Sequence, residues 1–251
     1  MKKIVIGNWK MNPASYSEAL KIFNSIKRFS DKLNSTDIVL CPPFIYQQPF
    51  IKKNKDNKVL IGAQNVFSEE QGAFTGEISV KMLKDIGITH VIVGHSERRS
   101  KGETDEDIAK KSHLLLDAGM YSIVCIGEKE RDANGNYLNF IKEQIKNSLS
   151  KVTKKTVNKL IIAYEPIWAI GAKEAMGPAD ILEMTLFIKK VISDMFGQSE
   201  VLNVPILYGG SVNFKNAGDI IRQGQVNGLL VGRESVNPIG FIELLKAVDT
   251  I

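Results

Sequence analysis

Three ionisable side chains, Lys10, His95 and Glu165, each follow a short apolar run of the sequence. If these runs are strands of one parallel sheet, the three side chains meet at the edge where the strands end. A carboxylate can take a proton from carbon there, while an imidazole and an ammonium group polarise a carbonyl whose negative charge grows as the proton leaves. The residue types therefore predict proton transfer next to a carbonyl group.

Each of the three residues also has an ordinary structural explanation. Taken alone, His95 is typical of a core histidine bonded to the backbone, Lys10 of a solvated surface lysine, and Glu165 of an ion pair within a barrel. Their shared position after apolar runs is what favours a common site. His90 and His113 lie at a strand start and on a helix, and we interpret both as structural.

The stretch from Leu160 to Gly171 joins a candidate base to an unusual loop. Pro166 follows Glu165 directly and lacks the N–H that a further strand position would donate, so the predicted strand stops at the acid. Beyond it the chain is apolar as far as Gly171, although loops normally face water. We therefore expect this segment to cover a site as a lid.

Eight apolar runs alternate with amphipathic stretches at a spacing of about 30 residues, the size of a strand, a helix and their connections. The runs are apolar throughout, as expected of parallel strands covered on both faces. This pattern predicts an α/β protein, a single-domain (βα)8 barrel over residues 1–251, with a doubly wound open sheet as the alternative. The predicted strands are Lys3–Gly7, Asp37–Cys41, Val59–Ala63, His90–Val93, Ser122–Ile126, Leu160–Tyr164, Pro205–Tyr208 and Val226–Val231.

Residues typical of helix ends support helices between these runs. Ser15 with Glu18, and Thr104 with Asp107, resemble capping boxes at helix starts. Other end signals are Pro178 and Pro238 at first helical positions, and Gly87, Gly119, Gly197 and Gly224 as C-terminal caps.

Glycines follow the last two predicted strands and leave backbone N–H groups unobstructed. Gly209, Gly210 and Ser211 follow the seventh run, and Gly232 follows the eighth. Many barrels hold a phosphate group after strands seven and eight. Because a pair of glycines is more often only a turn, phosphate binding and a structural turn both stay open at this point.

Composition and charge exclude several classes of function. The 33 basic and 28 acidic residues give a formal charge of +5 without a long basic run, so we expect a small anionic substrate and no nucleic acid. The apolar run after Lys3 is too short for a secretory signal, and no stretch approaches the roughly 20 apolar residues of a membrane span. We therefore expect a cytoplasmic protein without a membrane partner.

The sequence also lacks the usual signatures of metals and nucleotide cofactors. Cys41 and Cys125 lie inside apolar runs, where reduced core thiols are expected, and with three scattered histidines they form no zinc pattern. There is no Walker or dinucleotide-binding motif. Residues 94–98 resemble a nucleophile elbow, but Arg98 stands where the final glycine is required. We expect neither a metal nor a cofactor.

One connection, from Gln64 to Gly76, is longer than the others. Loops of this length are usually functional, and exposed aromatic residues such as Phe67 and Phe74 suggest a docking surface. The alternative is a loop that folds against its own barrel.

Seven segments, in order along the whole chain, carry a resemblance to a known family. They are Gly7–Asn12, Gly62–Asn65, Gly72–Glu77, Gly94–Arg99, Cys125–Glu128, Ala163–Gly171 and Tyr208–Val212. Together they resemble the triosephosphate isomerase family, whose fold is the (βα)8 TIM barrel.

The resemblance implies the interconversion of dihydroxyacetone phosphate and D-glyceraldehyde 3-phosphate through an enediol, a step of glycolysis and gluconeogenesis, without metal or cofactor. By position, Glu165 is the general base, His95 the neutral electrophile and Lys10 the fixed cation; these roles are taken from the family itself. Asn8 is a polar neighbour of this group.

Other residues take further family roles by position. The substrate-binding set is Asn8, Lys10, Gly171, Ser211, Gly232 and Arg233, and Ser96 and Glu97 are supporting residues, with Glu97 orienting Lys10. The lid, which keeps water from the intermediate, is Pro166, Ile167, Trp168, Ala169, Ile170, Gly171, Ala172, Lys173, Glu174 and Ala175. The resemblance also implies a homodimer, in which a loop with Phe67, Phe74 and Thr75 reaches the Asn8 and Lys10 region of the neighbour.

Two positions depart from the family pattern. The family usually has Thr-Gly-Lys after the lid glycine, where this chain has Ala172-Lys173-Glu174, a change in the C-terminal hinge of the lid. The usual glycine after Gly232 is here Arg233, which is strained if its φ must be positive.

Two alternative functions remain open at this stage. One is a barrel aldolase in which Lys10 forms a Schiff base with a sugar phosphate. The other is a non-catalytic barrel that only binds phosphate compounds.

Overall fold

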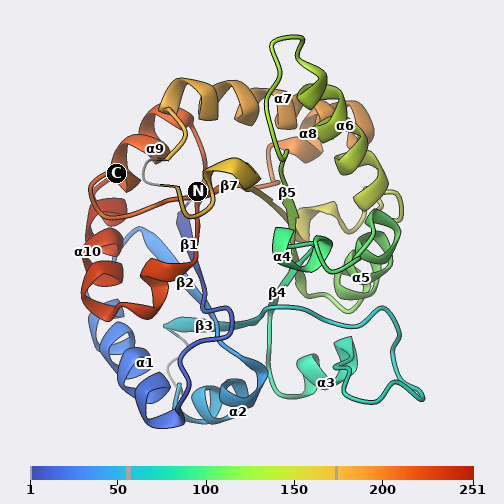
Figure 1. Cartoon of the computed structure of the whole chain (residues 1–251). Coiled ribbons are helices and arrows are strands. Elements are labelled where there is room, and N and C mark those ends of the chain that lie inside the picture. Colours follow the sequence, from blue (N-terminus) through green and yellow to red (C-terminus); the bar gives the residue numbers. More distant parts are fainter. Residues whose placement is uncertain (1, 55–57, 173–174) are drawn as a thin grey trace.

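The computed structural model describes residues 2–54, 58–172 and 175–251. Within these residues, eight parallel strands close into a barrel in sequence order (Figure 1). They are β1 Lys3–Asn8, β2 Thr36–Cys41, β3 Val59–Ala63, β4 His90–Val93, β5 Tyr121–Ile126, β6 Leu160–Tyr164, β7 Ile206–Gly209 and β8 Gly228–Val231. Because β1 pairs with both β2 and β8, the sheet has no open edge. The predicted (βα)8 barrel is confirmed, and the open sheet is ruled out.

Helices surround the barrel and connect its strands, and some short helical turns lie at the strand ends (Figure 1). The α-helices are α1 Tyr16–Ser30, α2 Phe44–Lys53, α3 Val80–Asp85, α4 Ser96–Arg99, α5 Asp105–Asp117, α6 Asn136–Ser148, α7 Pro178–Phe196, α8 Gln198–Val201, α9 Ala217–Gly224 and α10 Pro238–Asp249. The 3₁₀ turns are η1 Val157–Lys159, η2 Ile167–Ala169 and η3 Arg233–Val236. None of the helices in the described ranges is long and apolar enough to cross a membrane.

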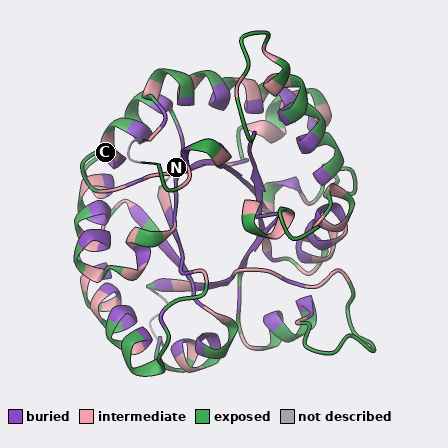
Figure 2. Ribbon diagram, in the orientation of Figure 1, coloured by how far each residue is buried: buried purple, intermediate pink, exposed green. Residues whose placement is uncertain are grey.

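Two apolar cores stabilise the barrel, and Figure 2 shows the strands buried on both sides. Side chains such as Ile6, Ile92 and Ile161 fill the barrel interior. A larger core lies between the strands and the helices, where the rings of Phe23 and Phe50 stack with centroids 4.5 Å apart. Burial on both faces explains why the strand sequences are apolar throughout instead of alternating.

Five predicted strands have different ends in the structure. β1, β2 and β5 are each one residue longer than predicted. β7 runs one residue later than predicted, and β8 begins at Gly228 instead of Val226. A Cβ atom at Gly228 would lie 1.8 Å from the carbonyl oxygen of Ile4 on β1. The glycine is therefore explained by the close approach of the two backbones.

Most of the predicted helix ends are confirmed. Thr104 and Asp107 form a capping box at the start of α5, and Ser15 caps α1 by accepting a hydrogen bond from the N–H of Glu18. The first residues of α7 and α10 are Pro178 and Pro238, and Gly87, Gly119 and Gly197 have positive φ at helix ends.

The predicted cap at Gly224 is wrong. Gly224 is the last residue of α9, and the following Gln225 takes the left-handed conformation, with φ of 51°. A Cβ atom at Gly224 would lie 2.6 Å from Cγ2 of Ile181 on α7. Close packing of the two helices therefore explains this glycine, and sequence alone does not distinguish that cause from a cap.

The long connection between β3 and α3 extends outward from the barrel (Figure 1). Within it, the rings of Phe67 and Phe74 contact each other with centroids 4.7 Å apart, and Phe74 remains 43% exposed. The N–H of Phe67 donates to the carbonyl of Ile78 at 2.8 Å and ties the two arms of the loop together. The loop thus presents an aromatic surface away from its own barrel.

Candidate active site

A cavity of about 510 Å³ opens where the strands end, and it brings together residues that are far apart in sequence. Its walls come from the ends of β1, β4, β6, β7 and β8. They include all of the predicted catalytic and substrate-binding residues: Asn8, Lys10, His95, Glu165, Gly171, Ser211, Gly232 and Arg233.

Glu165 and His95 face each other in the buried wall of this cavity. Nε2 of His95 lies 3.5 Å from Oε1 of Glu165, and the two residues are only 4% and 6% exposed. The backbone of Glu165 is held by its N–H, which donates to the carbonyl of Ile126 at 2.8 Å. A Cβ atom at Gly209 would lie 2.6 Å from Cγ of Glu165. The glycine at the end of β7 therefore makes room for the carboxylate.

The orientation of His95 is set by the start of α4. Nδ1 of His95 accepts a hydrogen bond from the N–H of Glu97 at 3.2 Å, which makes His95 the N-cap of the helix. A neutral ring that accepts at Nδ1 carries its proton on Nε2. The Nε2–H group then points into the cavity as a hydrogen-bond donor.

Lys10 is held in an unusual backbone conformation that the sequence did not indicate. Its φ is 54°, in the left-handed region that residues other than glycine rarely adopt. The N–H of Lys10 donates to Oδ1 of Asn8 at 3.1 Å, and Nε2 of Gln64 donates to its carbonyl at 2.8 Å. These bonds offset a strain of about 1–3 kcal/mol. Gln64 is a supporting residue that the predicted site omitted.

Glu97 sets the direction of the Lys10 side chain. Nζ of Lys10 donates to Oε1 of Glu97 at 2.6 Å. Partial burial acts to raise the pKa of Glu97, but the hydrogen bond and charge of Lys10 outweigh it, so the pKa lies below its usual value. The other predicted supporting residue, Ser96, lines a small cavity beside Glu165 and Ile167.

The glycines of the cavity wall include Gly232, where a Cβ atom would lie 3.5 Å from Cε of Lys10. Gly171 has a φ of 73°, while Gly232 has a φ of −85°. Arg233 opens η3 and does not occur among the residues of positive φ in the described part of the chain. The condition for strain at Arg233 is therefore not met, because the chain turns into η3 without needing a left-handed residue there.

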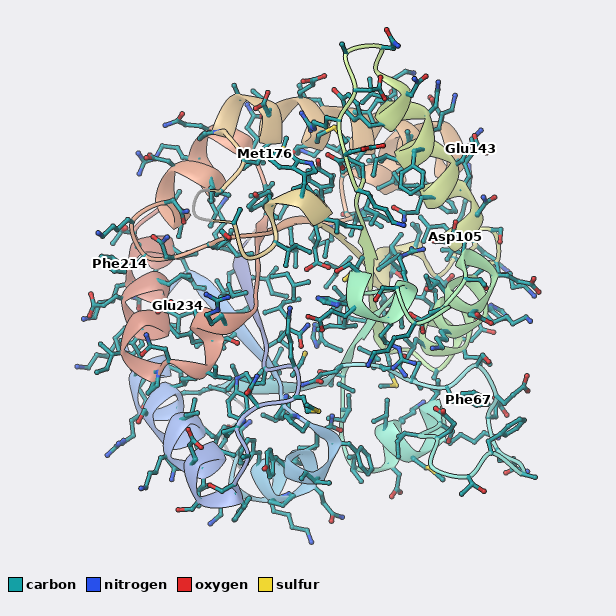
Figure 3. All side chains as sticks on the ribbon, in the orientation of Figure 1. Phe67, Asp105, Glu143, Met176, Phe214 and Glu234 are labelled. Atoms are coloured by element: carbon teal, nitrogen blue, oxygen red, sulfur yellow. The ribbon has the colours of Figure 1, made fainter. Side chains whose placement is uncertain are left out.

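Ile170, Gly171 and Ala172 of the predicted lid line the cavity, and the segment is bonded to residues at the strand ends. Oγ of Ser211 donates to the carbonyls of Ala172 at 2.7 Å and Ala169 at 3.2 Å. The N–H of Met176, labelled in Figure 3 where the chain leaves the lid, donates to the hydroxyl of Tyr208 at 3.1 Å. Burial raises the pKa of Tyr208 to about 12, so the hydroxyl stays neutral. Lys173 and Glu174, in the hinge that departs from the family pattern, lie outside the described residues.

Sequence reasoning missed several residues that hold the lid. Tyr208 lies within the apolar run of β7, and its neighbours in the sequence do not indicate that its hydroxyl group bonds to another segment. Glu128 follows β5 as a polar residue, which is the same signal that marked Glu165, and its Oε1 accepts from Nε1 of Trp168 at 3.1 Å. Arg131 donates to the same oxygen at 3.0 Å.

The two cysteines are free and buried, as predicted. Burial raises the pKa of both thiols, and for Cys125 the charge of the neighbouring Glu165 raises it further. Cys125 therefore stays a neutral thiol beside the carboxylate. Across the described ranges, no cluster of three or more His, Cys, Asp or Glu side chains is arranged to hold a metal ion.

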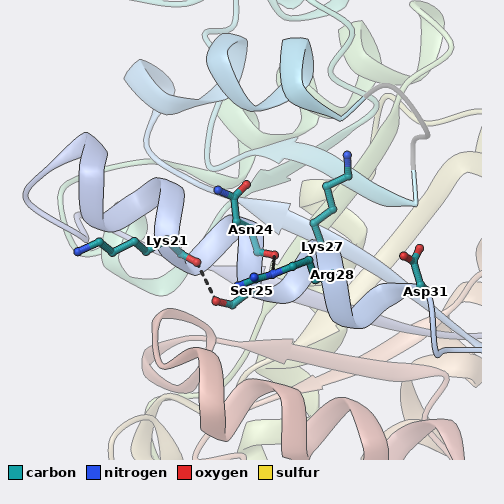
Figure 4. A pocket seen from close by; sticks show the side chains of 6 residues that line it. All are labelled: Lys21, Asn24, Ser25, Lys27, Arg28 and Asp31. Atoms are coloured by element: carbon teal, nitrogen blue, oxygen red, sulfur yellow. Dashed lines mark hydrogen bonds between the residues drawn. The ribbon is translucent and has the colours of Figure 1, made fainter.

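Another pocket lies on the outer face of α1, away from the strand ends (Figure 4). Its lining residues are Lys21, Asn24, Ser25, Lys27, Arg28 and Asp31. Two of its side chains bond within the helix: Oγ of Ser25 donates to the carbonyl of Lys21, and Nε of Arg28 to that of Asn24. It therefore has the features of a solvated helix surface.

The closed barrel, the paired carboxylate and imidazole, and the adjacent ammonium group define a (βα)8 enzyme that transfers protons on a small substrate. A family model described as triosephosphate isomerase matches residues 3–248. The chain belongs to the triosephosphate isomerase family, and it is an isomerase.

Relatives with this name match nearly the full length of the chain. One from Endomicrobium trichonymphae is 40% identical over 248 residues, which cover 98% of each chain. One from Lawsonia intracellularis is 40% identical over 250 residues, again with 98% of each chain covered. One from Aquifex aeolicus is 42% identical over 248 residues, 98% of this chain and 99% of the relative. The aldolase and the non-catalytic barrel are thus not favoured.

Proposed function

We propose that Glu165, His95 and Lys10 of this chain interconvert dihydroxyacetone phosphate and D-glyceraldehyde 3-phosphate. The observation that carries this assignment is the 3.5 Å approach of Nε2 of His95 to Oε1 of Glu165, two buried side chains in the wall of one cavity. A base and a hydrogen-bond donor at this separation can act on adjacent atoms of a small substrate.

The reaction needs one base and one donor in the same cleft. Glu165 takes a proton from the carbon next to the carbonyl, and the C–H electron pair becomes the double bond of an enediol(ate). Nε2–H of His95 and the Lys10 ammonium group stabilise the charge on the carbonyl oxygen. After the hydroxyl proton has moved between the two oxygens, Glu165 returns a proton to the neighbouring carbon, and the product differs from the substrate only in the position of its carbonyl.

The substrate phosphate binds at the glycine-rich wall of the cavity in this proposal. Gly171, Ser211, Gly232 and Arg233 line the cavity, and glycine backbones allow N–H groups to approach an anion closely. Asn8 and Lys10 complete the polar wall. The lid closes over the bound intermediate and keeps water from it, because an enediol phosphate exposed to water loses its phosphate.

We also propose that the chain acts as a homodimer in the cytoplasm. The loop with Phe67, Phe74 and Thr75 extends away from its own barrel and keeps an exposed aromatic face. Met11, directly after the catalytic lysine, is 94% exposed, and Ile45 is 71% exposed. Such apolar residues are typical of a surface that a second copy covers. The balanced composition and modest charge support the cytoplasmic location.

A coupled assay tests the catalytic assignment. Glyceraldehyde 3-phosphate is supplied, and the dihydroxyacetone phosphate formed is reduced by an NADH-dependent dehydrogenase. We expect Glu165→Gln to lower kcat by about 10²–10⁴-fold, the usual contribution of a general base, while Glu243→Gln on the surface of α10 leaves it unchanged. Turnover by the unaltered protein no faster than in buffer would refute the proposed function.

The oligomeric state tests the second proposal. Sedimentation velocity should give the mass of two chains, and Phe74→Asp should shift it toward one chain with a loss of activity. Phe140→Asp places the same charge on an aromatic residue of α6 that is 48% exposed, and it should leave the mass unchanged. A monomeric unaltered protein would contradict the dimer.

A further inference from the structure

Arg131 lies in the connection between β5 and α6. Its guanidinium group contacts several residues around the lid, and the amino-acid sequence did not predict a role for it. Its Nε donates to Oε1 of Glu128 at 3.0 Å, and its Nη2 donates to the hydroxyl of Tyr164 at 3.2 Å. The same nitrogen lies 3.8 Å from Sδ of Met176. The guanidinium carbon lies 5.8 Å from the ring centroid of Trp168.

These contacts reach both ends of the lid. Trp168 belongs to η2, just after the catalytic base, and Met176 lies just beyond the last lid residue. Glu128 adds a second link to the first end, because its Oε1 also accepts from Nε1 of Trp168 at 3.1 Å. One guanidinium group therefore contacts, directly or through Glu128, a residue at the start of the lid and the residue that follows it.

Because the Glu128 carboxylate is buried, it needs the positive charge of Arg131. The side chain of Glu128 is only 2% exposed and that of Arg131 is 21% exposed. A buried carboxylate without a cation is strongly unfavourable. Tyr137 on α6 supports the guanidinium from another side, with its ring centroid 4.7 Å from the guanidinium carbon. The group is thus held in one orientation by a carboxylate, a phenol and two aromatic rings.

We propose that Arg131 is a positioning residue that holds both ends of the lid in register over the bound enediol phosphate. This inference rests on the lid function proposed above and assigns to it a specific residue outside the cavity. Arg131 does not line the cavity, so it acts through Trp168, Glu128 and Met176. Its role is to keep the intermediate from losing phosphate to solvent.

The chemistry of the group predicts how substitutions behave. A planar guanidinium has several N–H donors in a fixed fork and stacks on aromatic rings, whereas a lysine ammonium is a compact charge without that fork. Arg131→Lys keeps the charge near Glu128 but cannot reach Tyr164 and both rings in the same way. Arg131→Met removes the charge as well.

The experiment compares Arg131→Met and Arg131→Lys with the unaltered protein and with Arg28→Met, a matched control on the exposed face of α1. Dihydroxyacetone phosphate is the substrate, and released inorganic phosphate is measured against the isomer formed. We expect Arg131→Met to raise the fraction of turnovers that eliminate phosphate by about tenfold, the order expected for lost charge-assisted hydrogen bonds. Arg131→Lys should give a smaller rise, and kcat should fall more than KM changes.

Hydrogen exchange of the peptide that spans residues 166–176 gives an independent readout. It is measured with and without 2-phosphoglycolate, and protection on binding should be weaker in both Arg131 variants. If Arg131→Met does not fold, as circular dichroism would show, Arg131→Lys carries both measurements. Elimination and protection equal to the unaltered protein in a folded variant would overturn the role of Arg131. An unaltered protein without isomerase activity would instead overturn the proposed function.

Discussion

Glu97 is bonded to two of the proposed catalytic groups at once: Oε1 of Glu97 accepts from Nζ of Lys10 at 2.6 Å, and its main-chain N–H donates to Nδ1 of His95 at 3.2 Å. The side chain therefore directs the ammonium group while the backbone orients the imidazole. A single residue outside the cavity lining couples the positions of the cation and the electrophile.

Replacing the Glu97 carboxylate should misplace Lys10 without disturbing His95. In Glu97→Gln the main-chain bond to the imidazole is kept, but the ion pair is lost, and we expect kcat/KM to fall by about 10- to 100-fold, as for small displacements of catalytic groups. Steady-state kinetics of this variant are compared with those of Glu106→Gln, whose carboxylate pairs with Lys110 on the surface of α5. Equal kinetics in the two variants would show that Glu97 does not position the lysine.

Shortening the base should affect the chemical step more than binding. Glu165→Asp withdraws the carboxylate by about 1 Å and should lower kcat roughly 10²-fold with a smaller change in KM. The coupled assay measures both constants over a range of substrate concentrations. Unchanged kcat would remove Glu165 from the role of base.

A methyl group at Gly209 should displace the base without altering its chemistry. The Cβ atom of Gly209→Ala would lie 2.6 Å from Cγ of Glu165, so we expect kcat to fall by about 10-fold or more through misplacement. Gly218→Ala on α9 is the matched control, because its Cβ would meet only Cδ1 of Ile251 at 3.7 Å. Circular dichroism melting of both variants separates loss of activity from loss of fold, and full activity in a folded Gly209→Ala protein would contradict the prediction.

The stability of the protein should fall in acid because of His90. Burial and then the charge of Lys159 lower the pKa of His90 to about 4, while an unfolded histidine titrates near 6.5. Between these pH values the unfolded state binds more protons, so the free energy of unfolding falls as the pH falls, by up to about 3 kcal/mol in total. Urea unfolding at pH 7 and pH 4.5 measures this loss.

The His90 contribution can be isolated by substitution. His90→Phe keeps an aromatic ring against Tyr121, whose centroid lies 4.4 Å from that of His90, and it removes the titrating group. The variant should lose less stability on acidification than the unaltered protein. His113, whose side chain is 44% exposed, provides the control His113→Gln, which should keep the full loss. The same acid sensitivity in His90→Phe would assign the effect to other groups.

The buried pair Lys111 and Glu103 should be important for stability near the base of the long loop. Nζ of Lys111 donates to Oε1 of Glu103 and, at 3.0 Å, to Oδ1 of Asn65, and both charged side chains are almost fully buried. Lys111→Met should lower the free energy of unfolding by about 3–5 kcal/mol, since it leaves a buried carboxylate with less compensation. The neighbouring Lys110→Met removes an exposed cation and should cost far less in urea unfolding; similar losses would refute the argument.

The sequence by itself determined the barrel fold and which residues meet in its cavity. Apolar runs of strand length at a regular spacing can bury both faces only between helices, and parallel strands all end on one side. For this reason Glu165, His95 and Gly232, each within two residues of the end of a run, had to meet at the same mouth. The motifs around them were also specific enough to indicate the family.

The tertiary structure decided how each group is held. The proton position on His95 depends on the N–H of Glu97, and the left-handed backbone of Lys10 depends on Asn8 and Gln64. Close packing against Ile181, instead of a helix cap, explains Gly224. The role of Arg131 can be inferred only from the folded structure, in which its guanidinium group contacts both Trp168 and Met176. Local residue patterns indicate which residues are buried and where strands and helices end. These contacts instead join segments that are far apart in sequence, and only the folded chain sets their distance and orientation.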